Sequence, residues 1–309
     1  MQHLRSLEAV ELDGSWVTIG AFDGVHLGHQ SIIRRLVEGA HRAGLPAVVV
    51  TFFPHPSKVL HGNGSPFYLT TPEEKAAILA SLDVDLVVTL TFDRQLASHT
   101  ADEFMHQLAE TLHLRHLLVG HDFALGRGRQ GNFAVLKQLG EKYGYAIEEL
   151  PPVDLNAGLI SSSRIRELLL QNDVTRAARY LGRRYAVEGN VVHGDGRGRA
   201  LGVPTANLDI WKERLVPGNG IYATQAFTGG QKYLSVSNIG LRPTFESQET
   251  QPRVEAYIMD FDRDLYGQEL QLEFVAFLRP ELRFPTVQAL VDQMRLDILQ
   301  AQEVLTHVT

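Results

Sequence analysis

The sequence predicts two domains of different fold class, a doubly wound α/β domain with a parallel sheet and an antiparallel β-barrel with a C-terminal helix. The chain has 309 residues, which is more than one typical domain holds. Its first half alternates short apolar segments with amphipathic ones, as α/β folds do. Near Leu181–Tyr185 the pattern changes to alternation with a period of two. We therefore expect domains at 1–182 and 183–309.

Five strands are expected in the first domain. They are short and mostly apolar, as in a sheet that helices cover on both faces. Thr71–Glu74 and Thr100–Glu103 have the pattern of capping boxes that begin helices between strands. In such sheets, ligands bind beyond the carboxyl ends of the strands. The predicted strands are Trp16–Gly20, Ala47–Phe52, Asp85–Leu90, His116–Gly120 and Ala146–Leu150.

The second domain shows strands without intervening helices. Leu270, Leu272 and Phe274 alternate with polar Gln271 and Glu273, which is typical of a strand with one buried face. Glycine-rich turns separate the segments, and this order favours an antiparallel barrel. The predicted strands are Tyr185–His193, Ile221–Phe227, Tyr233–Ser237, Val254–Phe261 and Glu269–Leu278, and a final helix is expected near Val287–Leu305.

The composition excludes several classes of function. The chain has no cysteine, so it has no disulfide, no thiolate zinc site and no cysteine nucleophile. A net charge of −7 argues against a broad nucleic-acid face but leaves a local basic pocket open. We find no long apolar run and no signal-peptide core. We therefore expect a cytoplasmic protein with no nucleic-acid or membrane partner, and weak self-association stays open.

The segment Gly20–His29 carries the clearest chemical signal. Two histidines, His26 and His29, lie in a glycine-rich turn between a predicted strand and a predicted helix. Backbone N–H groups at a helix N-terminus bind phosphates, and imidazoles can donate to phosphate oxygens. A turn histidine and a helix-capping histidine would be the structural alternative. The glycines and the strand–helix frame favour a site for the phosphates of a nucleotide.

Three more segments follow strands or begin helices in this domain. In Thr51–Pro56, Phe53 and His55 could contact a flat ring, or the prolines could simply stiffen a turn. Gly120–Gly131 is glycine-rich and basic, which suits a mobile phosphate loop better than a merely solvated one. Ile160–Arg166 begins a helix with serines and arginines, either as an anion site or as an ordinary N-cap.

The second domain contains a glycine-rich segment and an isolated acidic residue. Glycines in Gly194–Gly202 let backbone N–H groups approach phosphates, although a plain hairpin connection is equally compatible. Thr205 and Asn207 offer hard oxygen ligands to one Mg²⁺. Glu255 interrupts an apolar strand, and taken alone it is best explained as a solvent-facing strand residue.

The first-domain motifs together resemble the nucleotidylyltransferase superfamily and, more narrowly, the FAD synthetase module of bacterial riboflavin biosynthesis proteins. G-x-F-D-G-x-H-x-G-H, P-H-P, G-x-D-F-x-x-G and I-S-S-[ST]-x-I-R occur in that order, over roughly residues 15 to 180. The resemblance implies a nucleotidylyltransferase-like sheet and transfer of AMP from ATP to the phosphate of FMN. It departs from the family at Ala21, Phe53 and Ala124, and the change at Phe53 bears on flavin binding.

The resemblance also implies roles for individual residues. Catalysis would rest on positioning and charge neutralisation by His26, His29 and Arg164. Mg²⁺ would neutralise the pyrophosphate, although no firm protein ligand for it stands out in this domain. Residues implied to bind ATP and its phosphates are Gly20, Phe22, Gly28, Gly120, Asp122, Ser161, Ser163 and Arg166, and those implied to frame the flavin are Pro54, His55, Pro56 and Phe123.

The second domain resembles riboflavin kinase, over roughly residues 183 to 305. The segments G-R-x-L-G-x-P-T-A-N, G-I-Y-A, N-I-G-x-x-P-T-F and V-E-x-x-x-x-D-F-x-x-D-L-Y-G carry the resemblance. It implies that Glu255 is the general base for the ribityl hydroxyl, that Thr205 and Asn207 hold Mg²⁺, and that Asn238 contacts flavin. Ala256–Tyr257 departs from the family, and Arg295 is better explained as an exposed helix residue. Implied nucleotide-lining residues are Gly194, Gly196, Gly198, Arg199 and Gly202.

Both modules in this order imply a bifunctional enzyme that acts on riboflavin, FMN and ATP. One rival is another enzyme with the same histidine turn, such as a class I aminoacyl-tRNA synthetase. The acidic balance, the short chain and the barrel with Glu255 argue against it. A second rival is a non-catalytic flavin carrier or sensor. The presence of His26, His29, Thr205 and Asn207 argues against that interpretation.

Overall fold

The computed structural model describes residues 1–8, 10–62, 64, 67–152, 159–194, 198, 201–241 and 252–307. The chain folds into two compact units. Unit 1 comprises Met1–Gly64 and Tyr68–Ser162, and unit 2 comprises Ser65–Phe67 and Ser163–Thr309. The period change predicted at Leu181–Tyr185 coincides with the end of a helix and the start of a strand inside unit 2. A functional boundary at 182/183 stays a prediction.

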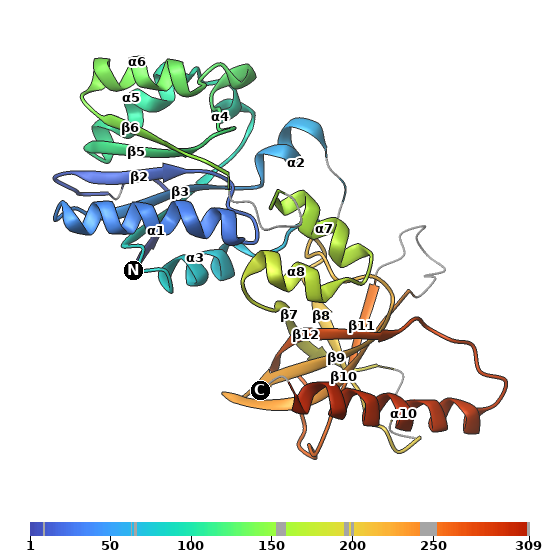
Figure 1. Ribbon diagram of the computed structural model, residues 1–309. Helices are drawn as coiled ribbons and strands as arrows, with labels where there is room; N and C mark the ends of the chain where they lie inside the picture. The colour runs from blue at the N-terminus through green and yellow to red at the C-terminus, as the bar shows by residue number, and fades with distance from the viewer. Residues whose placement is uncertain are drawn as a thin grey trace. The chain divides into compact units, whose positions relative to one another are not determined.

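Unit 1 is a six-stranded parallel sheet in the order β1-β4-β3-β2-β5-β6 (Figure 1). All five predicted strands are confirmed, and the edge strand β1 is an addition that the sequence did not indicate. Its three residues are too few for a readable periodicity. The strands are β1 (Gln2–Leu4), β2 (Ser15–Ile19), β3 (Ala47–Phe53), β4 (Leu86–Thr91), β5 (Leu114–Gly120) and β6 (Ala146–Leu150).

Helices cover both faces of this sheet, as Figure 1 shows for α1 and α3 on one face and α5 and α6 on the other. Val48 and Val50 pack in one core cluster and Val49 in the other, because successive strand residues point to opposite faces. Both capping boxes are present. The helices are α1 (Leu27–Arg42), α2 (Pro56–His61), α3 (Pro72–Ala80), α4 (Arg94–Ser98), α5 (Ala101–Thr111), α6 (Phe133–Tyr143) and the 3₁₀ turn η1 (Arg127–Arg129).

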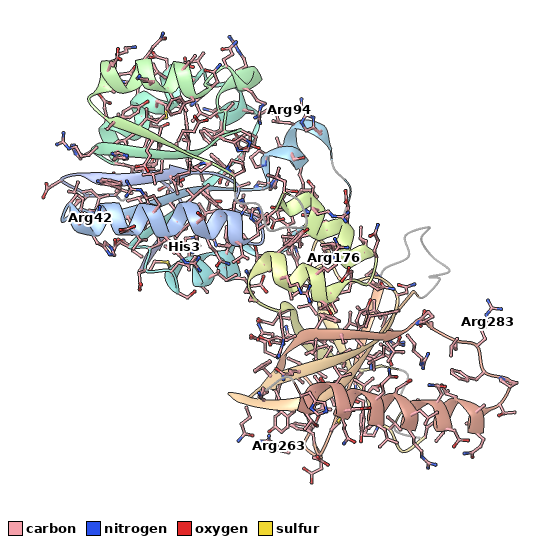
Figure 2. The ribbon with its side chains drawn as sticks, viewed as in Figure 1. His3, Arg42, Arg94, Arg176, Arg263 and Arg283 are labelled. Atoms are coloured by element: carbon pink, nitrogen blue, oxygen red, sulfur yellow. The ribbon has the colours of Figure 1, made fainter. Side chains whose placement is uncertain are left out.

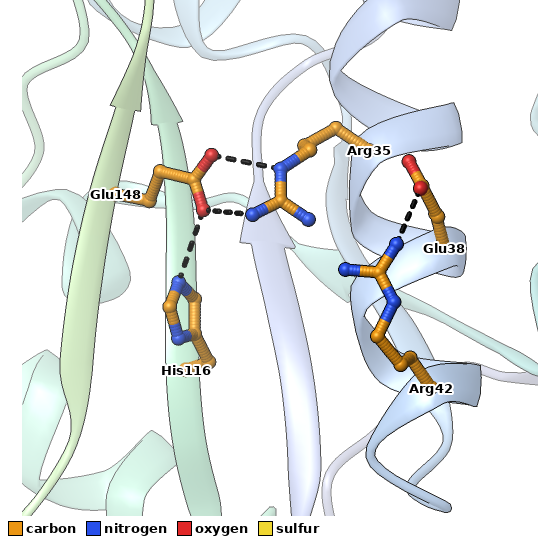
Figure 3. Close-up of polar contacts among 5 residues, drawn as sticks. All are labelled: Arg35, Glu38, Arg42, His116 and Glu148. Atoms are coloured by element: carbon orange, nitrogen blue, oxygen red, sulfur yellow. Dashed lines mark hydrogen bonds and ion pairs between the residues drawn. The ribbon is translucent and has the colours of Figure 1, made fainter.

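A polar cluster fixes α1 against the sheet (Figure 3). Arg35 donates two hydrogen bonds, of 2.9 and 2.8 Å, to the carboxylate of Glu148 in β6. His116 in β5 lies 3.5 Å from the same carboxylate and stacks on Trp16 in β2, with ring centroids 3.9 Å apart. Arg42 lies in the last turn of α1 (Figure 2) and pairs with Glu38 there. The cluster therefore orients the helix whose first turn carries His29.

Unit 2 is a closed antiparallel barrel in the order β10-β11-β8-β7-β12-β9, flanked by helices (Figure 1). The predicted strands and final helix are confirmed, and β8 is an addition. Val254, Ala256 and Ile258 of β11 are buried inside, so Glu255 and Tyr257 point to the other face. The elements are α7 (Ser162–Leu170), α8 (Val174–Leu181), β7 (Tyr185–Val192), β8 (Ala206–Ile210), β9 (Gly220–Thr228), β10 (Gln231–Leu241), β11 (Pro252–Ile258), β12 (Glu269–Arg279) and α10 (Val287–Thr306).

Helix α10 packs on the barrel through an apolar stripe. Ala301 and Leu305 are fully buried and contact Ala223 and Met259 in one core cluster. Residues four apart on a helix lie on the same face, which explains why this pair meets the sheet together. No helix in the described parts of the chain combines the length and the apolar character that crossing a bilayer needs.

Candidate functional site

The turn between β2 and α1 lies at the carboxyl edge of the sheet. The order of the strands reverses at β2, with β3 on one side and β5 on the other, and ligands of such sheets bind at this point. Phe22, Gly24 and Val25 adopt positive φ angles of 48°, 77° and 39°. The buried carboxylate of Asp23 holds this conformation by accepting hydrogen bonds from the backbone N–H groups of Leu69 and Thr70, at 3.0 and 3.3 Å. Asp23 thus orders the turn, a role that no sequence motif indicated.

His26 is the N-cap of α1. Its Nδ1 accepts a hydrogen bond of 3.3 Å from the backbone N–H of His29. His26 is therefore a helix-capping histidine, as the alternative to a phosphate-binding role had it. The capping hydrogen bond also fixes which ring nitrogen carries the proton. Because Nδ1 accepts, the neutral ring carries its proton on Nε2 and can act as a hydrogen-bond donor there.

The ring of His29 stacks on that of His26, with centroids 3.6 Å apart and planes 17° from parallel. Burial, followed by the nearby His26 and Lys75, holds the pKa of His29 well below 6.5. Its Nδ1 is buried and makes no hydrogen bond with any described residue. A buried polar atom without a protein partner indicates a place that a ligand or water atom can fill.

The first turn of α1 also presents backbone donors. The N–H groups of Leu27 and Gly28 make no hydrogen bond with other described residues. Donors at this end of a helix, together with the positive end of its dipole, favour a phosphate. A Cβ on Gly28 would lie 3.2 Å from the His26 ring, and one on Gly20 would lie 3.0 Å from the Phe22 ring. These glycines therefore also leave room for the aromatic side chains.

The P-H-P segment lies beside the histidine pair. His55 caps α2 through a 3.1 Å hydrogen bond from the Ser57 N–H to Nδ1, and it contributes to the lowered pKa of His29. The backbone N–H of His55 donates to the hydroxyl of Tyr68 at 2.9 Å. The ring of Phe53 lies 5.6 Å from that of Tyr68. The segment between Phe53 and His55 is therefore held by protein contacts near the predicted phosphate site.

The Gly120–Gly131 segment is anchored to the rest of unit 1. Leu125 and Gly131 form an isolated β-bridge, and the N–H of Arg127 donates to the carbonyl of His99 at 2.8 Å. Phe123 packs partly against the core, so its ring is engaged by protein, whereas the Asp122 side chain is 84% exposed. The structure places this segment after β5, at the same edge of the sheet as the histidines.

The predicted anion site at Ser161–Arg166 divides between the two units. Ser161 and Ser162 belong to unit 1, and the rest of α7 belongs to unit 2. The hydroxyl of Ser162 donates to the carbonyl of Asp23 at 2.9 Å. Arg164 pairs with Glu167 at 2.8 Å within unit 2. Arg166, also in unit 2, donates to the carbonyl of Phe67 at 2.9 Å. Ser163 and both arginines are thus not brought together with the histidines within one unit, and their role at the phosphates stays a prediction.

A second site lies between the barrel of unit 2 and α10. It is a cavity of about 520 Å³ whose walls include Thr205, Asn238 and Glu255 from the barrel side and Phe284 and Met294 from the helix side. Apolar walls with a few convergent polar groups are typical of a small-molecule site.

Glu255 lies at the centre of the polar wall. Strand register places Asn207 of β8 and Asn238 of β10 directly opposite it on its two sides. The Thr205 hydroxyl lies 3.4 Å from Oε2 of Glu255. The buried Oδ1 of Asn238 has no hydrogen bond with a described residue. Taken alone, Glu255 was best explained as a solvent-facing strand residue, whereas the resemblance implied a general base. The barrel gathers Glu255 with three other polar side chains.

Arg253 completes this cluster, although no sequence motif indicated it. Its Nε lies 2.8 Å from Oε1 of Glu255 and donates to Oδ1 of Asn207 at 2.7 Å. Arg253 and Glu255 are two apart on β11 and share one face, a spacing that could have indicated the pair. A Cβ on Gly194 would lie 2.3 Å from the amide nitrogen of Asn207, so a larger residue there would displace the Asn207 side chain.

The glycine-rich segment is described only in part. A Cβ on Gly198 would lie 2.4 Å from the carbonyl of Val203, and Gly202 has a φ of +76°. Both positions therefore need glycine for backbone reasons. Gly196 and Arg199 lie outside the described residues, so their predicted contact with nucleotide stays a prediction.

The residues present fit a hard cation in the second site. Thr205 Oγ1 and Asn207 Oδ1 are oxygen ligands of the kind that Mg²⁺ prefers, and they lie beside the Glu255 carboxylate. Asn207 Oδ1 accepts from Arg253 Nε in this structure, so a cation bound there would replace that contact. Within the described residues, no group of three or more His, Asp and Glu forms a metal centre on its own. A cation here would therefore share its coordination with ligand phosphates and water.

Two family models match the chain. The model described as FAD synthetase matches residues 9–164, and the one described as riboflavin kinase matches residues 181–305. A solved structure described as a macrolide-efflux protein from Streptococcus pneumoniae is 30% identical with a TM-score of 0.89, over 97% of this chain and 98% of that one.

Curated relatives match the chain over nearly its full length. A protein of Haemophilus influenzae is 36% identical over 98% of both chains, and one of Escherichia coli K12 is 36% identical over 97% of this chain and 96% of its own. Both are named bifunctional riboflavin kinase/FMN adenylyltransferase. Two matched models in the expected order and this coverage lead to one conclusion: the chain belongs to the bifunctional riboflavin kinase/FMN adenylyltransferase family.

Proposed function

We propose that this chain phosphorylates riboflavin to FMN and then adenylylates FMN to FAD. The observation that carries the proposal is the presence of two separate polar sites, one in each matched region. The stacked His26–His29 pair lies within residues 9–164, and the Glu255 cavity lies within residues 181–305. The riboflavin kinase reaction belongs to the second site and the adenylyl transfer to the first.

The adenylyl transfer needs no protein nucleophile. A phosphate oxygen of FMN attacks the α-phosphorus of ATP, the bond to the β-phosphate oxygen breaks, and pyrophosphate leaves. His26 donates from Nε2, and the N–H groups of Leu27 and Gly28 bind phosphate oxygens at the start of α1. These fixed donors stabilise the charge that grows on the leaving group. His29 is neutral near pH 7 in the free protein, and a bound anion favours its protonated form.

The kinase step uses Glu255 as the general base. The 5′-hydroxyl of the ribityl chain attacks the γ-phosphorus of ATP, its proton passes to the carboxylate, and ADP leaves. Arg253 orients that carboxylate through its 2.8 Å contact. Mg²⁺ would be held by Thr205 and Asn207, where it would neutralise charge on the phosphates.

Several assignments remain proposals. They are the roles of Gly120, Asp122 and Phe123 in ligand binding, of Ser161, Ser163, Arg164 and Arg166 at the leaving pyrophosphate, and of Asn238 in contact with flavin. A domain boundary at 182/183, a cytoplasmic location and weak self-association are predictions of the same kind. The substrates riboflavin, FMN and ATP are the small-molecule partners that the two reactions require.

The direct test is an assay of the purified chain with riboflavin, ATP and Mg²⁺, with products separated by chromatography. We expect FMN to appear first and FAD to follow, each only when ATP is present. Chelation of the divalent cation should stop both steps. A protein that binds riboflavin but forms neither product would be a flavin carrier, and this result would overturn the proposal.

A further inference from the structure

Lys75 is a charged side chain that the motifs do not include, and it is buried in unit 1 with only 6% of its surface exposed. Its Nζ donates to the carbonyl of Ala21 at 2.7 Å and to the hydroxyl of Thr51 at 3.0 Å. The Thr51 hydroxyl in turn donates to the same carbonyl at 3.0 Å. A buried ammonium is costly unless the site uses or compensates it, so this placement calls for a role.

The two partners of Lys75 lie in the two segments that are expected to bind substrates. Ala21 lies in the histidine turn, between Gly20 and Phe22. Thr51 lies near the end of β3, four residues before His55. One side chain from α3 therefore joins the phosphate turn to the start of the P-H-P segment. The links run between residues 54 and 24 positions apart in the sequence, so no local pattern could indicate them.

The charge of Lys75 acts on the same site. Its proximity contributes to the lowered pKa of His29, after burial and His26. Two charged groups face the ammonium: Asp23 raises the pKa of Lys75, and Arg5 lowers it. The charge of Lys75 in turn helps to lower the pKa of His3 in β1. Burial dominates these effects and lowers the pKa of Lys75 to about 8. The side chain is thus a cation at pH 7 and loses its charge above about pH 8.

We propose that Lys75 is a positioning residue for adenylyl transfer to FMN, fixing the histidine turn against β3 and placing a buried positive charge beside the phosphate site. The inference rests on the proposed function. A purely structural role would need only a hydrogen-bond donor and would leave the pH dependence of the reaction unchanged. The proposed role needs the charge, and it therefore predicts a pH dependence that only the adenylyl transfer has.

The test compares the full-length wild type with Lys75→Met and Lys75→Arg, and uses Lys137→Met as the control for loss of an exposed lysine of unit 1. The measurement is kcat/KM for ATP in FMN adenylylation between pH 6.5 and 9.5, since this ratio reports ionisations of the free enzyme. Riboflavin phosphorylation by the same samples reports whether unit 2 is intact.

We expect Lys75→Met to lower FMN adenylylation about 10- to 100-fold at pH 7, as for other losses of active-site positioning. Riboflavin phosphorylation should stay within about twofold of the wild type, and Lys137→Met should leave both steps unchanged. The wild-type adenylylation should fall above about pH 8, because the ammonium loses its proton there. This alkaline decline should be absent in Lys75→Met and shifted to higher pH in Lys75→Arg, whose guanidinium stays charged.

Thr51→Val removes one partner of the ammonium without removing its charge, and it keeps the experiment decisive if Lys75→Met does not fold. We expect it to lower adenylylation severalfold and to retain the decline above pH 8. Full adenylylation by a folded Lys75→Met, or an alkaline decline that survives in it, would overturn the role of Lys75. If that variant does not fold, an unchanged pH profile in Lys75→Arg would do so. A wild type that makes no FAD would instead overturn the proposed function.

Discussion

His29 illustrates how burial controls chemistry at a single residue. Its Nδ1 is enclosed without a protein partner among the described residues, and its ring is stacked against that of His26. Burial lowers the pKa of His29 most, because it disfavours the charged ring. His26 lowers it further, because two stacked imidazoles do not readily carry two positive charges. His29 is therefore neutral in the free site, and a bound anionic substrate would favour its protonated form.

The same shift predicts how stability depends on pH. The folded chain holds the pKa of His29 below the 6.5 of an unfolded chain, so the unfolded state takes up this proton first as the pH falls. The resulting stability is present above pH 6.5 and is lost below it, by at most about 1.4 kcal/mol per pH unit for one proton. His29→Asn should make the urea unfolding of unit 1 less sensitive to acid between pH 7 and 5.5. An identical acid sensitivity in the variant would contradict the assignment.

At the scale of elements, α1 must be held closely enough to the sheet to place its first turn. Gly39 allows this approach, because a Cβ there would lie 2.0 Å from the ring of Trp16. Trp16 in turn stacks on His116, next to the Arg35–Glu148 pair of Figure 3. The helix is thus positioned by one small residue and one bidentate ion pair.

Gly39→Ala should destabilise unit 1 by about 1–3 kcal/mol, since the ring of Trp16 has to move. We expect lower FMN adenylylation and an unchanged rate of riboflavin phosphorylation. Ser31→Ala, on an exposed position of the same helix, is the control for helix propensity. Urea denaturation with both activities measured on the same samples checks this expectation. A Gly39→Ala protein as stable as the wild type would show that α1 does not depend on this contact.

Helix α10 closes one side of the second site through a buried ion pair. Arg279 of β12 donates to both oxygens of Asp297, at 2.7 and 2.6 Å, and Gln293 donates to the same carboxylate at 2.9 Å. The side chains of Arg279 and Asp297 are 16% and 4% exposed, and both residues line the cavity. Breaking a buried pair leaves an uncompensated charge, which costs more than the pair itself contributes.

Asp297→Asn should therefore raise KM for riboflavin about tenfold and destabilise unit 2 by roughly 1–3 kcal/mol, because the amide keeps one acceptor. FMN adenylylation should not change. The control is Asp292→Asn on the exposed face of the same helix, where the carboxylate lies 3.8 Å from Arg295. Steady-state kinetics at varied riboflavin check the prediction. Equal effects of the two substitutions would contradict a specific role for the buried pair.

At the scale of the whole molecule, both fold classes could be predicted because their signals are local. Strand alternation and capping boxes are read from neighbouring residues, and they gave the order of strands and helices correctly. The strand β8 was missed because it has only five residues, two of them polar, and begins two residues after Pro204. The edge strand β1 was missed for a similar reason, since it has only three residues.

The candidate sites were predictable only where a motif marked them. His26, His29 and Glu255 stand in such motifs. Lys75 follows Glu73 and Glu74 in a helix, a context typical of an exposed residue, yet its partners lie in distant segments. Arg253 and Asp297 likewise gain their roles from cross-strand and helix–barrel contacts. Residues that position others are recognised by three-dimensional contact and not by local sequence.

We propose that two chemically independent sites act in sequence within this chain, and one pair of variants separates their contributions. Both half-reactions are measured separately, riboflavin to FMN and FMN to FAD, for the wild type, Glu255→Gln and His29→Ala. We expect Glu255→Gln to lower FMN formation at least about 100-fold, through loss of the general base, with FAD formation from added FMN unchanged. His29→Ala should have the opposite pattern. Loss of both half-reactions in either folded variant would show that the two reactions do not have separate sites.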